Sequence, residues 1–253
     1  MKKILLLYLL VLSNFLTAQT KTIHVFVALC DNEYQGIVPV PARIGNGKDP
    51  KNNLYWGAGY GVKSFFKLKT TDWKLIANPP TNNPYILERI LFKHTSKNVY
   101  LLADAYDGEK IKNCIEDFLK VANRQNPETI NYNSQKLKFG GVANLVAYVG
   151  HNGLMDFNIT MDYNLVPFPK TDIMILACYS KQYFAGEIRN ANANPILWTT
   201  HLMAPEAYTL KAAIDGWILN ENGKQIKERA AQAYNKYQKC GIKGARNLFS
   251  NGF

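Results

Sequence analysis

Two reactive side chains stand directly after apolar segments of the chain. His151 follows the segment LVAYVG, and Cys178 follows the segment DIMILA. Runs of this length and composition predict strands that are buried on both faces of a parallel sheet. If the two strands are parallel neighbours, both side chains emerge at the same carboxyl edge, where ligands bind in open α/β sheets. The sequence therefore predicts one site that contains both residues.

A cysteine beside a histidine suits acyl transfer through a covalent intermediate. A thiol is only partly ionised near neutral pH, and a neighbouring imidazole favours the reactive thiolate. The same imidazole can protonate the amine that leaves. Backbone N–H groups near the two residues would stabilise an oxyanion. Taken alone, each residue has an ordinary explanation, because a single Cys at a strand end is usually just buried.

The two segments resemble the caspase-like cysteine peptidases of clan CD, which include caspases, legumains, gingipains, clostripain and separase. In that group an apolar strand ends in His and Gly, and a later strand ends in Ala-Cys. The sequence ACYS at 177–180 is especially similar to the Ala-Cys-x-Ser of legumains. The resemblance implies that Cys178 is the nucleophile and His151 the general acid/base. It also implies a mostly parallel sheet flanked by helices, and chemistry that needs no metal or organic cofactor.

One position departs from the pattern of that group. The resembled peptidases place Gly directly after His, whereas Asn152 follows His151 here and the next glycine is Gly153. The oxyanion donors are therefore the N–H of Asn152 or Gly153, together with the N–H of Cys178. The departure leaves open a second function on the same fold, a catalytically inactive binding protein of the cell envelope. The segment 153–159 is expected to form a hairpin.

A substrate pocket is expected among the loops at the strand ends. In the resembled group, the side chain on the acyl side of the cut bond enters such a pocket, and an acid there selects Arg or Lys. Acids at or after the expected strands are candidates for this role, with an ordinary surface position as the alternative for each. They are Asp31, Glu33, Asp104 and Glu206. His201 lies inside an apolar segment and is expected in the core.

The elements that must position these residues alternate along the chain. Apolar segments predict strands at 22–30, 88–95, 98–106, 142–150, 172–178 and 195–203. Amphipathic segments predict helices within 54–68 and at 107–125, 208–219 and 224–239. Strands separated by helices indicate parallel strands joined by crossovers, so the expected fold class is α/β, a three-layer sandwich. The chain after Cys240 is expected to be irregular.

The first residues predict a secretory signal peptide. Lys2 and Lys3 precede an apolar run that ends at the small residue Ala18, which is the order of a cleavable export signal. The run is shorter than the roughly 20 apolar residues that a membrane span needs. We therefore expect 1–18 to be removed and 19–253 to form a single domain. The mature protein is expected to be periplasmic or secreted, and not an integral membrane protein.

The chain is basic, with 30 Lys and Arg against 19 Asp and Glu and a formal net charge of +11. Such a charge favours anionic surfaces, but the lysines are scattered and no nucleic-acid motif is present. A solvated basic surface is the expected interpretation, and the expected partner is a peptide or protein substrate. None of the cysteines lies in a C-x-x-C spacing that would predict a metal site. They are Cys30, Cys114, Cys178 and Cys240.

Overall fold

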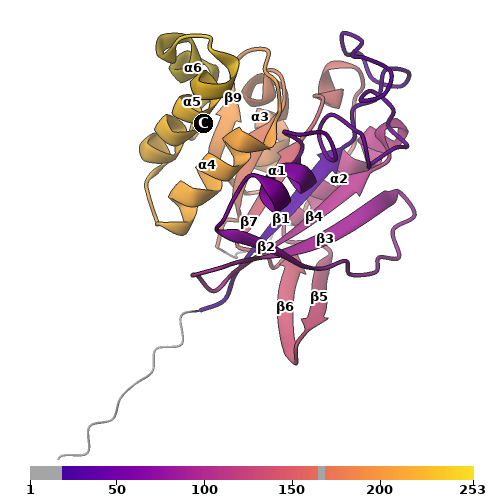
Figure 1. Cartoon of the computed structure of the whole chain (residues 1–253), viewed down its shortest axis with the longest axis vertical. Helices are drawn as coiled ribbons and strands as arrows, with labels where there is room; N and C mark the ends of the chain where they lie inside the picture. The colour runs from indigo at the N-terminus through magenta and orange to yellow at the C-terminus, as the bar shows by residue number, and fades with distance from the viewer. Residues whose placement is uncertain (1–18, 165–168) are drawn as a thin grey trace, which may run out of the picture.

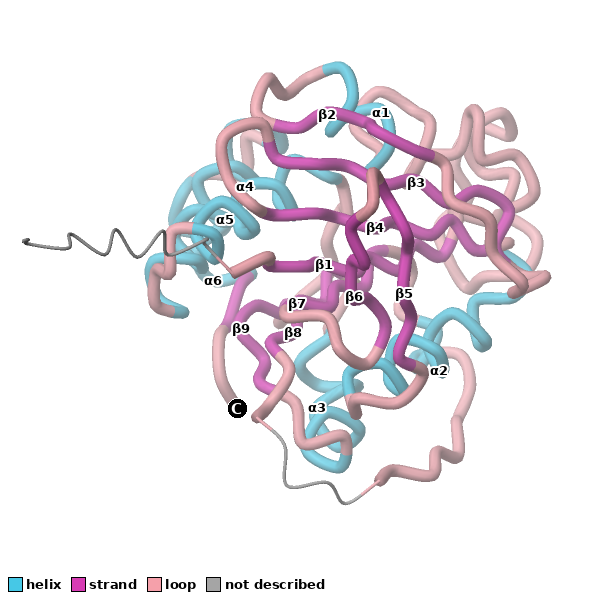
Figure 2. The backbone as a smooth tube through the Cα atoms, turned by 90° about the horizontal axis from the view of Figure 1, so that it is seen from below, coloured by secondary structure: helices cyan, strands magenta, loops and turns pink. Residues whose placement is uncertain are grey.

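The computed structural model describes residues 19–164 and 169–253, so the predicted signal peptide lies outside the described residues. A central sheet of eight strands runs through the molecule, and helices pack on both of its faces (Figure 1). A hairpin of two further strands lies beside the sheet (Figure 2). The strand order across the central sheet is β10-β9-β8-β7-β1-β4-β3-β2.

The middle of the sheet is parallel and its edges are antiparallel. The parallel strands are β1 (Lys21–Ala28), β4 (Val99–Tyr106), β7 (Leu145–Val149), β8 (Asp172–Leu176) and β9 (Asn194–Thr199). The strands that run antiparallel to a neighbour are β2 (Trp73–Ala77), β3 (Ile86–His94) and β10 (Phe249–Ser250). The parallel strands are mostly apolar on both faces, since helices or the hairpin cover both sides of them.

Two layers of helices cover the sheet (Figure 2). One layer contains α1 (Val62–Leu68), α4 (Ala207–Ile218), α5 (Gly223–Gln238) and α6 (Ile242–Leu248). The other contains α2 (Ile111–Ala122) and α3 (Ser180–Asn190). Val149 and Leu176 point to the first layer, whereas Tyr148 and Ile175 point to the second, as the alternation of strand side chains requires. The expectation of an α/β fold with a mostly parallel sheet flanked by helices is confirmed.

Local signals explain why two of these helices form. The side chain of Asn222 accepts hydrogen bonds from the N–H groups of Lys224 and Gln225, and Gln225 Oε1 accepts a hydrogen bond from the Asn222 N–H. This capping box satisfies N–H groups that the first turn of α5 leaves free. In α2 the buried residues recur every three or four positions, among them Ile115 and Phe118. That spacing places them on one face, which packs against the sheet.

A hairpin that the sequence analysis did not predict lies against β3 and β4. It consists of β5 (Pro127–Tyr132) and β6 (Gln135–Gly140). Its turn residues, Asn133 and Ser134, both have positive φ angles, at 45° and 62°, as two-residue hairpin turns with the favoured twist require. Its buried side chains share a cluster with residues of the sheet. The members are Ile130, Leu137, Phe139, Leu91, Tyr100 and Leu102.

Two local expectations are wrong. The chain after Cys240 is not irregular, because it forms α6 and then β10, where Phe249 is buried against the core. The segment 153–159 forms no hairpin. It contains the short 3-10 turn η2 (Gly153–Met155), and the rest of the segment has no regular structure.

A buried ion-pair network fixes the hairpin to the sheet. Asp104 of β4 is fully buried and accepts hydrogen bonds from Arg89 Nε at 2.6 Å and Arg89 Nη2 at 2.7 Å. The Nε2 atom of His24 lies 2.9 Å from the same carboxylate, and Arg89 also pairs with Glu128 of β5. Burial opposes ionisation of Asp104. The contacts with His24 and Arg89 outweigh it and hold the pKa of this carboxyl below its usual value.

We expect Asp104→Asn to lower the free energy of unfolding by about 3–5 kcal/mol, because the Arg89 charge then stays buried without its main partner. The ion pair stabilises the folded state above the usual Asp pKa of about 3.9, and this contribution is lost as the pH falls through the lower folded-state pKa. Urea unfolding at a series of acidic pH values measures both effects. Exposed Asp162→Asn is the control, with an expected change below about 0.5 kcal/mol. Equal stability of the two variants would contradict the assignment.

Candidate active site

The register of β7 and β8 brings the two candidate residues to one edge of the sheet. The strands are parallel neighbours, and Val149 lies opposite Leu176. His151 and Cys178 each stand two positions beyond this pair. The N–H of Gly150 still donates to the Leu176 carbonyl at 3.3 Å, so the pairing continues to the residue before the histidine. Both side chains therefore begin at corresponding positions of the carboxyl edge.

The chain can turn at this edge because position 150 is glycine. Gly150 has φ +154°, and an added Cβ would lie 3.0 Å from the Ala28 carbonyl oxygen of the neighbouring strand. A side chain there would press on β1. The Tyr148 hydroxyl donates to the His151 carbonyl at 2.7 Å, which fixes the backbone on the other side of the turn.

The ring of His151 is held by a carboxylate that the sequence analysis did not single out. His151 is buried, and its Nε2 atom lies 2.6 Å from Asp156 Oδ2. The same oxygen accepts a bond from the Gly36 N–H at 3.1 Å. Because an ionised carboxylate only accepts hydrogen bonds, Nε2 carries the proton in this arrangement. The Nδ1 atom has no partner among the described residues and is free to act as a base. The only sequence signal for this pair is that Asp156 is the first acid after the histidine.

The thiol of Cys178 faces the backbone that follows β9. Its sulfur accepts a hydrogen bond from the Met203 N–H at 3.4 Å and lies 3.6 Å from the Met203 carbonyl oxygen. Burial raises the pKa of the Cys178 thiol, and the Met203 N–H opposes this effect. The thiol is therefore protonated at neutral pH in this arrangement. No hydrogen bond or ion pair joins it to His151 within the described part of the chain.

The turn after the cysteine is strained and firmly held. Tyr179 has a φ of 48°, a left-handed conformation that a bulky residue adopts rarely. The next residue, Ser180, is fully buried, and its hydroxyl donates to the Ile175 carbonyl at 3.0 Å and lies 3.0 Å from the Thr199 hydroxyl. Thr199 in turn bonds the Ala177 carbonyl. These contacts fasten the end of β8 to β9, so the serine of ACYS has a structural role.

Asn152 links the two strand ends through its side chain. It is fully buried, its Nδ2 atom donates to the Cys178 carbonyl at 2.6 Å, and its Oδ1 atom accepts from the Leu154 N–H at 3.1 Å. On the far side of the same peptide group, the Tyr179 N–H donates to the His201 carbonyl at 3.0 Å. The peptide group after Cys178 is therefore held from both sides.

The backbone donors expected for an oxyanion bind no other residue of the described chain. The Gly153 N–H makes no hydrogen bond within the described ranges, and the Cys178 N–H faces its own sulfur. The side chain of Asn152 points to the Cys178 carbonyl and not to these N–H groups. The assignment of Asn152, Gly153 and Cys178 to an oxyanion hole stays a prediction.

Three of the four acids considered for a substrate pocket are engaged by other residues or exposed to solvent. Asp31 is buried, and its Oδ1 atom accepts from the N–H groups of Glu33 at 2.8 Å and Tyr34 at 3.2 Å, so it shapes the loop after β1. Glu33 is exposed to solvent. Asp104 belongs to the buried ion-pair network in the middle of β4 and is already occupied by His24 and Arg89.

Glu206 is the acid that lies nearest along the chain to the residue in contact with Cys178. It stands three residues after Met203, the residue that contacts the Cys178 sulfur. Burial raises the pKa of Tyr55 well above its usual value, and the nearby Cys178 and Glu206 side chains add to this shift.

The expectation that His201 is a core residue is wrong. The strand expected over 195–203 ends at Thr199, and His201 beyond it is exposed. Its Nδ1 atom lies 2.8 Å from the Thr200 hydroxyl, and its ring lies 6.0 Å from the Tyr179 ring. The residue therefore lies on the rim of the candidate site.

The remaining cysteines differ in burial. All four cysteines are free; Cys30 and Cys114 are buried, and Cys240 is exposed. Burial raises the pKa of Cys30 to about 11 and that of Cys114 well above its usual value, so both thiols are unreactive near neutral pH. Within 19–164 and 169–253, no group of three or more His, Cys, Asp or Glu side chains could hold a metal ion.

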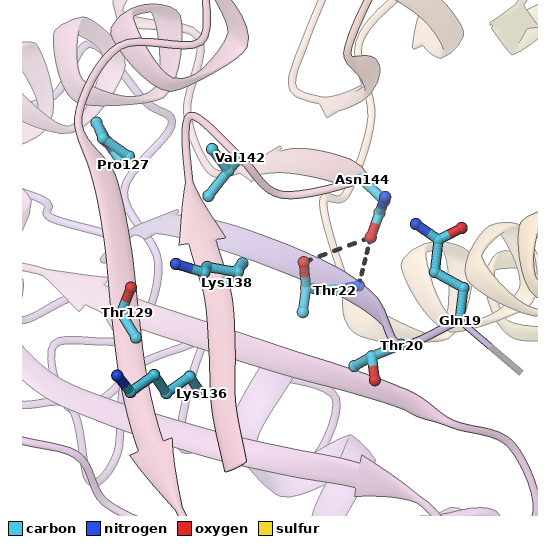
Figure 3. Close-up of a pocket in the computed structure, with 9 residues that line it drawn as sticks. All are labelled: Gln19, Thr20, Thr22, Pro127, Thr129, Lys136, Lys138, Val142 and Asn144. Atoms are coloured by element: carbon cyan, nitrogen blue, oxygen red, sulfur yellow. Dashed lines mark hydrogen bonds between the residues drawn. The ribbon is translucent and has the colours of Figure 1, made fainter. Parts of the chain in front are cut away.

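A basic depression lies at the other end of the sheet. It has a volume of about 370 Å³ and lies between the start of β1 and the hairpin, with Lys136 and Lys138 on one side and Thr22 and Asn144 on the other (Figure 3). Both lysines are exposed, so the feature is part of the basic surface that the composition predicts. In the part of the chain that the structure describes, no helix is long and apolar enough to cross a membrane.

Comparisons of the chain with protein-family models, with curated proteins and with solved structures found no match. The resemblance to caspase-like peptidases therefore stays an expectation that rests on the sequence at the two strand ends.

We expect Asn152→Asp to lower the free energy of unfolding by about 1–3 kcal/mol, because the change replaces the donor to the buried Cys178 carbonyl with an acceptor. Exposed Asn158→Asp, in the same segment, is the matched control and should change stability by less than about 0.5 kcal/mol. Chemical denaturation of the two variants measures the difference. The hydrogen bond from Asn152 to the Cys178 carbonyl does not contribute to stability if Asn152→Asp is as stable as its control.

Proposed function

We propose that the chain is an exported cysteine endopeptidase of caspase-like fold, with Cys178 as nucleophile and His151 as general acid/base. One observation carries the proposal: two neighbouring parallel strands, paired in register, end in these two residues at the same carboxyl edge. A strained strand-to-helix turn follows the cysteine, and strained backbone concentrates at functional sites. A peptide or protein is the proposed substrate.

The chemistry begins with attack of the Cys178 sulfur on a substrate carbonyl carbon. The thiol proton passes to His151 Nδ1, and the carbonyl electrons move to oxygen. Collapse of the tetrahedral intermediate restores the carbonyl and breaks the C–N bond, while His151 returns the proton to the leaving nitrogen. Water then attacks the thioester, gives a proton to His151, and displaces the sulfur, which takes that proton back.

Two kinds of polar group support these steps. Asp156 accepts a hydrogen bond from His151 Nε2 and so keeps the lone pair of the ring on Nδ1, where the proton must be received. We therefore assign Asp156 as a positioning residue. The N–H groups of Gly153 and Cys178 are available to bind the oxyanion, a contact that stabilises the developing charge more than the substrate carbonyl.

A second candidate function is a non-catalytic binding protein of the cell envelope on the same fold. The observation that favours it is the contact of the Cys178 sulfur with the Met203 backbone, together with the raised pKa of this thiol. For the peptidase, an entering substrate has to replace this contact. For the binding protein, the contact is permanent and the thiol stays inert.

We expect Cys178→Ala to reduce the hydrolysis of a library of quenched fluorogenic peptides by at least about 10³-fold, because the acyl-enzyme cannot form. Cys240→Ala removes an exposed thiol outside the site and should leave the rate unchanged. Full activity in Cys178→Ala would exclude the proposed mechanism. No hydrolysis by the parent protein, with alkylation of Cys178 no faster than that of a free thiol, would favour the binding protein.

We expect Asp156→Asn to lower kcat by about 10- to 100-fold with little change in KM, because the amide no longer fixes the His151 tautomer. Asp156→Glu should restore part of kcat, and Asp162→Asn should behave as the parent protein. Steady-state kinetics and thermal unfolding are measured on the same samples. A parallel loss of stability and of kcat in both Asp156 variants would show that the residue acts only on folding.

A further inference from the structure

The basic depression between the hairpin and the start of β1 contains two lysines and no acid. Lys136 and Lys138 of β6 line one side of it, and among the described residues that line it none is Asp or Glu (Figure 3). Its volume of about 370 Å³ lies in the range of small-molecule pockets. The depression therefore combines unbalanced positive charge with enough room for a small ligand.

The neighbours of the two lysines do not neutralise them. Lys136 and Lys138 stand two positions apart, so their side chains leave the same face of β6. Their partners across the hairpin are neutral, because Lys138 lies opposite Thr129 and Lys136 lies opposite Asn131. Neither lysine forms an ion pair with a described residue. Like charges on one face repel each other, and an anion bound between them removes this repulsion.

A second pocket of similar size shows how the chain balances a lysine elsewhere. This pocket lies beside α1, has a volume of about 400 Å³, and contains Lys211 and Asp72. The two side chains pair at 2.7 Å, so the lysine charge is balanced within the chain. The basic depression has no such acid, and only solvent ions or a ligand can balance its charge.

A buried hydroxyl without a close partner also lines the depression (Figure 3). Thr22 is 2% exposed, and the one contact of its hydroxyl among the described residues is with Asn144 Oδ1 at 3.5 Å. An O–H···O hydrogen bond normally spans about 2.5–3.0 Å. The same oxygen already accepts the Thr22 N–H at 2.8 Å. Because a buried polar group without a hydrogen bond is costly, the Thr22 hydroxyl indicates an acceptor from outside the chain.

Hydrogen bonds hold Thr22 and Asn144 in a fixed arrangement. The Asn144 N–H donates to the Thr22 carbonyl at 2.9 Å, and the Thr22 N–H donates back to the Asn144 side chain. Since Asn144 Oδ1 is turned to Thr22, the Nδ2 atom remains a donor without a partner among the described residues. The depression therefore offers two ammonium groups, a hydroxyl and an amide nitrogen, all of which can donate.

We propose that the basic depression binds a phosphate group. A phosphate has three strong acceptor oxygens, which these donors can bind together, whereas a carboxylate has two. Val142 lines the same depression, is 40% exposed, and offers an apolar surface to the rest of a phosphate ester. Thr22 lies at the amino end of β1, whereas Cys178 follows the carboxyl end of β8. The proposal is therefore independent of the peptidase function.

Isothermal titration calorimetry with glucose 6-phosphate, inorganic phosphate and glucose tests this proposal at low ionic strength, where charge interactions are least screened. We expect saturable one-to-one binding of both phosphate compounds with a Kd of about 1 mM or lower, and no binding of glucose. Tighter binding of glucose 6-phosphate identifies a phosphate ester as the ligand. Equal or tighter binding of inorganic phosphate identifies the free ion.

Variants separate a built site from general attraction to a basic surface. Thr22→Val removes the hydroxyl without a change of charge and should weaken phosphate binding about 10-fold, as expected for a hydrogen bond to a charged group. Thr22→Ser keeps the hydroxyl and should bind as the parent protein does. Lys136→Gln with Lys138→Gln should weaken binding about 10- to 100-fold. The matched control, Lys67→Gln with Lys243→Gln, removes two exposed lysines outside the depression and should leave Kd unchanged.

Two results would overturn the proposal. The first is the absence of saturable binding for both phosphate compounds. The second is an equal loss of affinity in the two double lysine variants together with no effect of Thr22→Val, because phosphate would then respond only to the overall charge. Thermal unfolding of each variant shows that it is folded, and the double lysine variants decide the question if Thr22→Val does not fold.

Discussion

The in-register parallel pairing of β7 and β8 is the constraint on which the candidate site depends. Side chains of parallel neighbours that lie opposite each other point to the same face. The turns that carry His151 and Cys178 therefore start at matching positions of the two strands. A shift of one residue in this pairing would send one of them to the opposite face of the sheet. The apolar cores above and below the strands fix the register, because Val149 and Leu176 belong to one core and Tyr148 and Ile175 to the other.

Most of the sheet could be predicted from the sequence because its parallel strands are continuous apolar runs. The hairpin β5–β6 was not predicted because its strands carry only a few buried residues. Its turn is Asn133-Ser134, a weaker hairpin signal than Asn-Gly. The C-terminal helix α6 was not predicted because it is only seven residues long and carries few apolar residues to mark a buried face. The apolar residues of 195–203 predicted a strand that is too long, since β9 ends at Thr199 and His201 is exposed.

The positions of the two principal site residues could be predicted because each stands directly after a strand. Their supporting contacts could not, since these depend on turns that bring distant atoms together. Asp156 reaches His151 only because the η2 turn reverses the chain between them. The acids looked equivalent in the sequence, and only their surroundings separate Glu206 from Asp104, which lies inside an ion-pair network.

The contacts that hold the candidate nucleophile act on main-chain atoms. Asn152 bonds the Cys178 carbonyl, the Tyr179 N–H is bound by another carbonyl, and the Tyr148 hydroxyl bonds the His151 carbonyl. Main-chain atoms are common to all residues, so the side chains at the rim can be exchanged without moving the reacting centre. For the proposed peptidase, in evolutionary terms, the recognition of a substrate and the machinery of catalysis are separable. A descendant of this chain can acquire a new preference at the rim and inherit the rest of the site unchanged.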